Sequence, residues 1–364
     1  MVGERDISYL SRKCRILAFL AAVGIVAIHS DCTMVLDNPA AWNIFVEKLY
    51  CQRLTKWAVP FFFTLSGIWF ARGGYAKGEL GYFNFIGKKV HSLIVPWIIF
   101  AIVGVLFLTP LVMVNNHFTN RELLARTVFE SGSVWQMIND TFAITIPQPK
   151  MAGFLWYVRT LFALFLLAPL WKILLGVSPW LFLVGFIVLK AFPFDISCIY
   201  FGACHCFFLG VFLGAYCDST ILLNKNRLPW MAVSFLCIGI VMAIVWAGVD
   251  ARWWMFPGVA RLWQQVTPLV LGVGIWMYYD IVEYRIPRNL PEFVNWSMWI
   301  YLAHSVVASY FLATFRFLFG KSDMVTIWLP AANVVVTTFV CIVLGYFMLK
   351  KCPKLFTVCC GGRA

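Results

Sequence analysis

Charged residues are scarce in this sequence. Only 12% of its 364 residues are Asp, Glu, Lys or Arg, and 62% are hydrophobic, whereas soluble domains carry about 25% charged residues. A chain with this composition cannot form a water-soluble surface without large exposed apolar patches. We therefore predict that lipid surrounds the protein and that residues 1–364 form a single integral-membrane domain.

Acidic residues are the rarest of the charged types, with 16 Asp and Glu against 29 Lys and Arg. The resulting net charge of +13 does not indicate nucleic-acid binding, because the basic residues are spread between hydrophobic runs rather than gathered in one stripe. The 12 cysteines show no zinc-binding spacing. We expect no nucleic-acid partner and no metal site.

The hydrophobic runs predict an all-α polytopic membrane protein of about ten transmembrane helices, since about 20 apolar residues span a bilayer. The run that follows the basic N-terminal residues has no convincing cleavage site after it, so we interpret it as a retained helix rather than a signal peptide. The predicted spans are residues 14–32, 55–71, 89–113, 153–171, 179–192, 199–216, 229–248, 262–281, 294–317 and 325–349.

The basic residues predict the orientation of these helices. With the N-terminus inside, 17 of them fall in cytoplasmic segments, 11 in outer segments and one, Arg159, within a span. Because cytoplasmic loops carry an excess of Lys and Arg, we predict a plasma (inner) membrane protein with both termini in the cytoplasm. The long outer loop between about Asn115 and Gly153 is either a cover over an outward-facing site or a solvated connector.

His29 is the first ionisable residue within a predicted span. It lies roughly 21 Å along the helix from Arg15, near the outer surface. Imidazole suits proton transfer near neutral pH. Asp31 either turns back to orient the ring or is a solvated carboxylate at the helix end. One helical face carries Arg15, Ala18, Ala22, Ile25, Val26 and His29. Its small residues indicate either close helix packing or the wall of a narrow tunnel.

Other polar residues in the spans have a structural and a functional interpretation. Arg159 lies at a depth similar to that of His29, where it either reaches the headgroups or binds substrate. Trp156 and Tyr157 are either interfacial aromatics or substrate contacts. His304, near the midplane, is either a buried structural histidine or part of the site.

Basic residues also begin the third predicted span. Lys88, Lys89 and His91 precede Pro96 on the cytoplasmic side. They are either topology anchors or a cationic site for the phosphates of coenzyme A.

Several stretches together resemble the acyltransferase-3 family. CRILAFLAAVGIVAIHS is similar to the family's opening helix, and KWAVPFFFTLSGIWF to its second, with Pro60 and the Ser66–Gly67 pair. GKKVHSLIVPW is similar to its basic third segment. FLWYVRTLFALFLLAP, IYLAHSVV and the terminal GGR resemble further stretches. The matches extend from residue 12 to residue 363.

The resemblance implies a membrane-bound O-acyltransferase that uses cytoplasmic acyl-CoA, often acetyl-CoA, to modify sugars of surface polysaccharides or glycolipids. It also implies that His29 is the central catalytic residue. Without an appended soluble domain, the chain resembles the stand-alone branch of the family, which includes fucose O-acetylases. The sequence departs from the family pattern in three places. Ala18 stands where the first-helix arginine is usual, and Thr160 where some relatives have an acidic residue. At the entrance of the third span, where relatives commonly have arginines, this sequence has Lys88, Lys89 and His91.

We therefore predict transfer of an acyl group, usually acetyl, from acyl-CoA to a hydroxyl of a carbohydrate or glycolipid at the outer side of the membrane. His29 is the predicted base or acyl carrier, assisted by Asp31. Lys88, Lys89, His91 and Arg15 are predicted to bind the acyl-CoA, and Trp156, Tyr157, Arg159, His304 and Ser66 to bind the acceptor or the oxyanion. The alternative is a transporter or flippase of a small polar or lipid-linked molecule. A structural or sensory protein would leave the buried histidines without a task.

Overall fold

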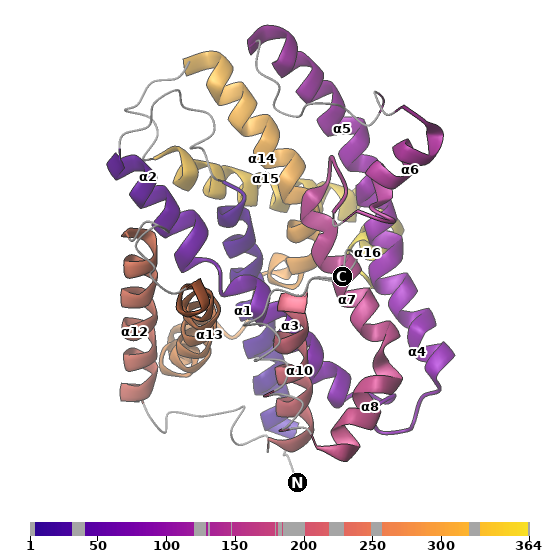
Figure 1. Ribbon diagram of the computed structural model, residues 1–364, viewed down its shortest axis with the longest axis vertical. Helices are drawn as coiled ribbons and strands as arrows, with labels where there is room; N and C mark the ends of the chain where they lie inside the picture. The colour runs from indigo at the N-terminus through magenta and orange to yellow at the C-terminus, as the bar shows by residue number, and fades with distance from the viewer. Residues whose placement is uncertain are drawn as a thin grey trace.

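The computed structural model is predominantly helical in the part of the chain that it describes (Figure 1). The described residues are 4–30, 41–119, 129, 132–146, 148–178, 180, 184, 201–217, 229–248, 257–319 and 328–362. They contain no β-strand. The all-α prediction is confirmed.

The number of membrane spans is lower than predicted within these residues. Five helices have the length and composition to cross a bilayer, and a sixth is obtained if one bent pair counts as a single span. The five are Tyr82–Val114, Pro229–Gly248, Leu262–Arg285, Ser297–Phe315 and Leu329–Lys351. The count of about ten is thus not confirmed, and the predicted fifth span, 179–192, lies almost wholly outside the described residues.

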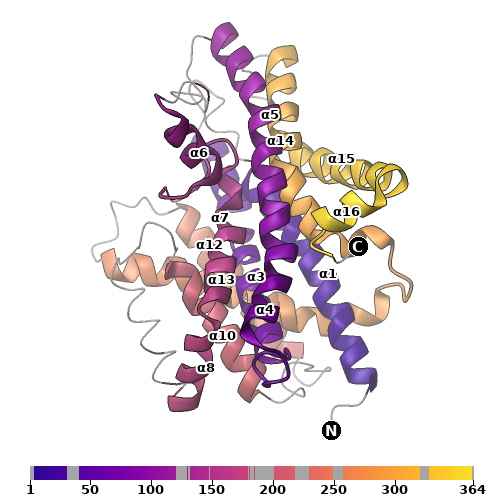
Figure 2. The ribbon, with the colours of Figure 1, turned by 90° about the vertical axis from the view of Figure 1, so that its right-hand side faces the viewer.

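The N-terminal helix α1 (Glu4–Ile28) runs from the edge of the molecule, near the N-terminus, into the middle of the bundle (Figures 1 and 2). Ala21, Ala22 and Val26 on it are fully buried. It is followed by α2 (Ala41–Glu47), the π-helix η2 (Lys48–Leu54) and α3 (Ala58–Ala71). The small side chains of Ala21 and Ala22 allow neighbouring helices to pack closely against α1.

Helices α4 (Tyr82–Lys89) and α5 (Val95–Thr119) form one long rod, joined by the π-helical turn η3 (Val90–Ile94). Pro96 has no backbone N–H, so it cannot complete the regular hydrogen-bond ladder at this turn. The turn places the basic residues of the third predicted span just before the apolar part of the rod. The upper ends of α5 and α14 lie side by side, far from the N-terminus (Figure 2).

The long outer loop of the prediction contains the short helix α6 (Val134–Phe142). After it come a 3-10 turn η5 (Gly153–Leu155), α7 (Trp156–Leu166) and α8 (Ala168–Val177). The α7 and α8 axes differ by 60°, which makes them the bent pair noted above. Pro169 cannot donate to a carbonyl of α7, so the helix breaks where α8 begins.

Glycines bring α3 and α10 (Phe201–Tyr216) into direct backbone contact. A Cβ at Gly210 would overlap the Thr64 carbonyl, and one at Gly67 would lie 2.7 Å from the Val211 nitrogen. Close approach through small residues is the usual way that membrane helices associate, since lipid provides no hydrophobic drive between them. This crossing fixes the second predicted span against the sixth.

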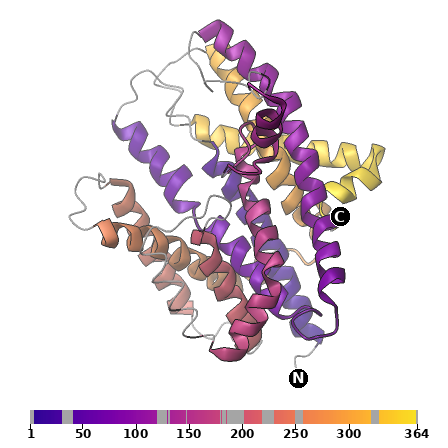
Figure 3. The ribbon, with the colours of Figure 1, turned by 45° about the vertical axis from the view of Figure 1, so that its right-hand side comes forward.

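The remaining helices form two groups. α12 (Pro229–Gly248) packs on α13 (Pro257–Val282) at one side of the molecule (Figure 3). The 3-10 turn η7 (Glu283–Arg285) continues α13, and η8 (Glu292–Asn295) precedes α14 (Ser297–Phe319). α14 contacts α1, α5 and α15 (Leu329–Lys351), and α16 (Pro353–Cys359) returns to α5.

Large apolar side chains on the outer faces of these helices are exposed. Trp230 on α12 and Phe317 on α14 are each 82% exposed, and Val335 and Phe339 on α15 are exposed as well. Patches of this kind would aggregate in water but are suited to contact with lipid tails. The exposed surface agrees with the low charge of the sequence in indicating a membrane protein.

Candidate functional site

His29 faces a cavity of about 380 Å³ at the end of α1, and we call this space the His29 cavity. Its side chain is exposed to that space rather than packed away. Its polar lining residues come from four separate parts of the chain: His29, Lys56, His205, Gln264 and Gln265, with the aromatic side chains of Trp156, Tyr157 and Tyr301. A space of this size accommodates a small polar substrate beside the imidazole.

His304 lies directly against His29. The centroids of the two imidazole rings are 5.2 Å apart, with 39° between the ring planes. Nδ1 of His304 is 2.6 Å from the Tyr301 carbonyl oxygen, so it must be the donor, because a carbonyl only accepts. In the neutral ring, Nε2 is then the proton acceptor. That atom is buried and has no hydrogen-bond partner in the structure.

Four polar residues of the His29 cavity were missed by sequence reasoning. Lys56 belongs to the turn before α3, His205 to α10, and Gln264 and Gln265 to α13. His205 and Gln264 fall within predicted spans, so an ionisable or amide side chain in a hydrophobic run was the signal that would have found them. His205 is buried, and its Nε2 is 3.3 Å from Sγ of Cys206.

Pro268 leaves one backbone carbonyl near the same cavity without its helical hydrogen bond. It lies inside α13 and lines the cavity four residues after Gln264. In a regular helix the carbonyl of Gln264 would accept a hydrogen bond from the residue at 268, which as proline has no N–H. The proline therefore leaves the Gln264 carbonyl without its helical donor, next to the Gln264 side chain.

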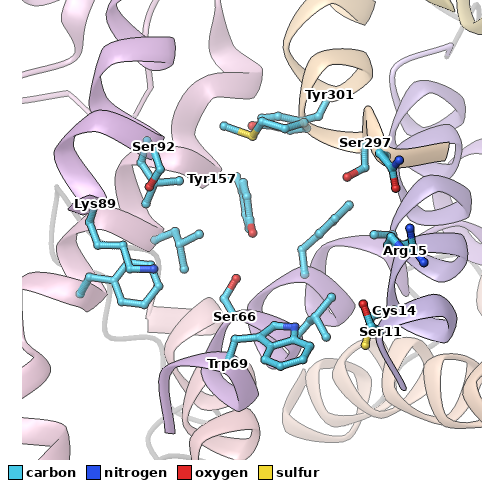
Figure 4. A pocket seen from close by; sticks show the side chains of 18 of the residues that line it. Ser11, Cys14, Arg15, Ser66, Trp69, Lys89, Ser92, Tyr157, Ser297 and Tyr301 are labelled. Carbon is cyan, nitrogen blue, oxygen red and sulfur yellow. The ribbon is translucent and has the colours of Figure 1, made fainter. Parts of the chain in front are cut away.

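A second cavity of about 420 Å³, the Arg15 cavity, lies further toward the N-terminal end of α1. Arg15 and Lys89 occupy opposite sides of it, with Ser66 and Trp69 of α3 between them (Figure 4). Nζ of Lys89 lies 4.4 Å from the centroid of the Phe165 ring. Two cations around one cavity are suited to binding an anionic ligand such as a phosphate ester.

Tyr157 and Tyr301 line both cavities and so form the wall between them. Their ring centroids are 5.5 Å apart, and the Tyr301 hydroxyl donates a hydrogen bond to the Phe154 carbonyl. The hydroxyl of Tyr157 points into the Arg15 cavity (Figure 4). Any group that passes from one cavity to the other must displace or slip past these two side chains.

The predicted polar face of α1 reaches both cavities. Arg15 and Ala18 line the Arg15 cavity, and Ile25 and His29 line the His29 cavity. Ala22, which lies between these pairs, is fully buried. This face of α1 is therefore packed against other helices in its middle and lines a cavity at each end. Both interpretations of its small residues, close packing and the wall of a passage, apply to part of the face.

The other predicted basic residues do not share the Arg15 cavity. Lys88 and His91 line a separate cleft between α4 and the C-terminal residues Thr357–Gly362, which we call the Lys88 cleft. Consecutive helical residues point about 100° apart, so Lys88 and Lys89 face different spaces. The predicted set of four cationic ligands is thus divided between two places.

Arg159 and Asp31 complete the predicted residues. The Arg159 guanidinium donates to the carbonyls of Ala143 and Ile146, the latter at 2.8 Å, in the loop after α6. It ties that loop to α7. Asp31 lies outside the described residues.

A buried ion pair below the cavities was also missed. Nζ of Lys13 on α1 lies 2.6 Å from Oδ1 of Asp280 on α13, and both side chains are almost fully buried. The Tyr9 hydroxyl donates to the same oxygen, at 2.6 Å. Lys13 is one of the 17 basic residues that the sequence assigns to the cytoplasmic side, and the sequence pattern indicates no other role for it. An acidic residue near the end of a predicted span was the signal for Asp280.

Helices with lipid-exposed faces, a histidine pair and two abutting cavities define a membrane protein with an internal site. The family model described as an acyltransferase domain matches residues 16–348, and the chain belongs to this acyltransferase-3 family. No curated protein and no solved structure matches it. The protein is therefore a membrane acyltransferase, as the resemblance in its sequence predicted.

Proposed function

We propose that this acyltransferase moves an acyl group, in the simplest case acetyl, from acyl-CoA to a hydroxyl of a sugar or glycolipid. One observation carries the proposal. His29 faces a cavity and touches His304, and that cavity shares a tyrosine wall with a second one that contains two cations. A base and an anion-binding site on either side of one wall are what transfer from a phosphorylated donor to a hydroxyl requires.

The Arg15 cavity is the proposed donor site. Arg15 and Lys89 on its opposite walls bind phosphates of acyl-CoA, and Ser66 offers a hydroxyl to the pantetheine arm. The donor enters from the cytoplasm, the side predicted from the basic residues. Lys88 and His91 remain predicted ligands, but any phosphate that they hold lies in the Lys88 cleft rather than beside Arg15.

His29 performs the central step. Its imidazole removes the proton from the acceptor hydroxyl, whose oxygen attacks the thioester carbonyl carbon. The carbon–sulfur bond breaks, and the sulfur leaves as a thiolate that takes up the proton from His29. In the two-step version the His29 nitrogen attacks the thioester carbonyl carbon, the carbon–sulfur bond breaks, and the thiolate takes up the proton of the other His29 nitrogen. The acceptor hydroxyl then attacks the acyl-histidine, the carbon–nitrogen bond breaks, and the hydroxyl proton passes to the released imidazole. Both versions need the lone pair of one His29 nitrogen to face the reacting groups.

His304 serves as the positioning residue for His29. Its Nε2 is the buried acceptor without a partner, next to the His29 ring. An N–H of His29 that points toward this atom leaves the other His29 nitrogen free to accept the substrate proton. This role is the one that the sequence assigned to Asp31.

The His29 cavity is the proposed acceptor site, toward the outer side of the membrane. Trp156 and Tyr157 provide aromatic surfaces for the apolar face of a sugar ring. Gln264 and Gln265 offer amides that donate to and accept from hydroxyl groups. In this proposal the protein lies in the inner membrane with both termini in the cytoplasm, as the basic residues predict.

The test uses purified full-length protein and radiolabelled acetyl-CoA. We expect wild-type protein to transfer the acetyl group or to hydrolyse the thioester slowly, and His29→Ala to lower that turnover by about 10²–10⁴-fold, the usual contribution of a general base. Cys237→Ala, at an exposed position on α12, is the control for purification. Melting curves of each variant show whether the fold is kept.

Two outcomes contradict different parts of the proposal. Wild-type protein that turns over none of a panel of acyl-CoA donors excludes the donor class. Full activity in His29→Ala removes His29 from the mechanism and leaves the enzyme class in place.

A further inference from the structure

The His29 cavity contains a cation without a counter-charge. Lys56 lines the cavity from the turn between η2 and α3. No described lining residue is acidic. In the part of the chain that the structure describes, the ion pairs join other residues, and the side chain of Lys56 forms neither an ion pair nor a hydrogen bond.

The neighbouring cation does not neutralise Lys56. Arg53 lies three residues earlier, and its guanidinium stacks on the Trp246 ring, 3.9 Å from the ring centroid. Two positive side chains near one cavity raise its positive potential. An ammonium that is half-buried among apolar groups and has no partner is unfavourable, and a negatively charged ligand group would remove that cost.

The neutral polar groups of the cavity suit the rest of such a ligand. Gln264 and Gln265 supply amides, and Trp156 supplies an aromatic surface. Aromatic faces and amides are complementary to the two faces and the hydroxyls of a sugar ring, and an ammonium is complementary to a carboxylate or phosphate attached to it. Together these side chains match a saccharide that carries a negative charge.

We propose that the acceptor is an anionic saccharide and that Lys56 binds its carboxylate or phosphate group. The inference rests on the proposed function, in which the His29 cavity holds the acceptor. Lys56 then determines specificity without taking part in the bond changes. A neutral sugar would leave the ammonium unpaired and would bind more weakly.

The binding test measures the melting temperature of the full-length protein in detergent. The probes are D-glucuronate, D-glucose 6-phosphate and neutral D-glucose, at equal ionic strength. We expect wild-type protein to be stabilised by at least one anionic sugar and not by glucose, and the preferred probe tells whether carboxylate or phosphate is recognised. Lys56→Gln should weaken the apparent affinity for that probe by about tenfold or more, because a hydrogen bond to a charged group is lost. Lys56→Arg should retain most of it.

A kinetic measurement distinguishes binding of the acceptor by Lys56 from a role of Lys56 in the reaction itself. Hydrolysis of acetyl-CoA without an acceptor should persist in Lys56→Gln, because the donor is proposed to occupy the Arg15 cavity, which Lys56 does not line. If the variant loses that hydrolysis, Lys56 acts on the reacting thioester and the proposal is wrong. Equal stabilisation by neutral and anionic sugars, no stabilisation by any of them, or an unchanged preference in Lys56→Gln also overturns it. If wild-type protein itself does not hydrolyse acetyl-CoA, that result contradicts the proposed function and not the role of Lys56.

Discussion

At the residue scale, the tautomer of His304 is set by the backbone of its own helix. The Tyr301 carbonyl, 2.6 Å from Nδ1, fixes the ring proton on that nitrogen. Nε2 is thereby left as an acceptor beside His29, in a place that water does not reach. Burial makes a group of this kind costly to leave unpaired, so we expect it to be satisfied by the His29 ring during the reaction.

Two substitutions of His304 test this assignment. The amide of Asn lies near the position of Nδ1, whereas the amide of Gln reaches the position of Nε2. We expect His304→Asn to lower acetyl-CoA turnover by roughly 10–100-fold, the effect of losing a hydrogen bond to a charged group, and His304→Gln to retain more activity. The measurement is the turnover rate of each variant beside its melting temperature. Equal activity of the two variants would show that Nε2 has no role.

At the element scale, the buried pair between Lys13 and Asp280 joins two helices that build the site. α1 carries His29, and α13 carries Gln264 and Gln265. Nζ of Lys13 also lies 4.1 Å from the centroid of the Trp276 ring. The pair therefore fixes the register of the two helices that supply the base and the amides.

Removing one partner of this pair should be costly. We expect Asp280→Asn to lower the free energy of unfolding by about 3–5 kcal/mol, because it leaves a buried ammonium without its counter-charge. The double variant Lys13→Met with Asp280→Met should be more stable than Asp280→Asn, since it leaves no buried charge. Denaturant unfolding in detergent measures both. A double variant less stable than the single one would contradict this account.

The crossing of α3 and α10 gives a second prediction at this scale. Gly210→Ala should destabilise the protein by about 1–3 kcal/mol or more, because the added methyl overlaps the Thr64 carbonyl and the helices must separate. Gly176→Ala on α8 is the matched control, as no atom lies within 4 Å of its added Cβ. Thermal unfolding of the two variants compares them. A Gly210→Ala protein as stable as the control would show that the helices do not cross this closely.

At the scale of the whole molecule, the direction of transfer depends on which side each cavity faces. The basic residues at the start of α1, on α4 and at the end of α15 predict that these ends are cytoplasmic. Two of these basic residues also form ion pairs: Arg12 with Glu283, at 2.5 Å, and Lys13 with Asp280. The Arg15 cavity, nearer the start of α1, then opens toward the compartment that contains acyl-CoA.

Reporter fusions test this orientation. Alkaline phosphatase joined before residue 1 or after residue 364 should be inactive, because the enzyme matures only outside the cytoplasm, and a fluorescent protein at either end should be bright. The opposite pattern at both ends would reverse the proposed direction of transfer. A different result at each end would show an odd number of spans.

The sequence by itself determined the class of protein, the approximate course of the helices and the position of His29. Hydrophobicity and span length are local properties, so a run of apolar residues predicts a membrane helix without knowledge of its neighbours. The family resemblance was likewise contained in local motifs, and the family match confirmed it. The count of about ten spans was not confirmed in the described residues.

Only the tertiary structure decided which polar residues share a space. Arg15 and Lys89 meet around one cavity, although 74 positions separate them, whereas the neighbouring Lys88 faces another. The partner of Lys13 lies 267 positions away on α13. Such encounters depend on how helices cross and rotate against one another, and that is settled by packing across the whole bundle rather than by the pattern of any single helix.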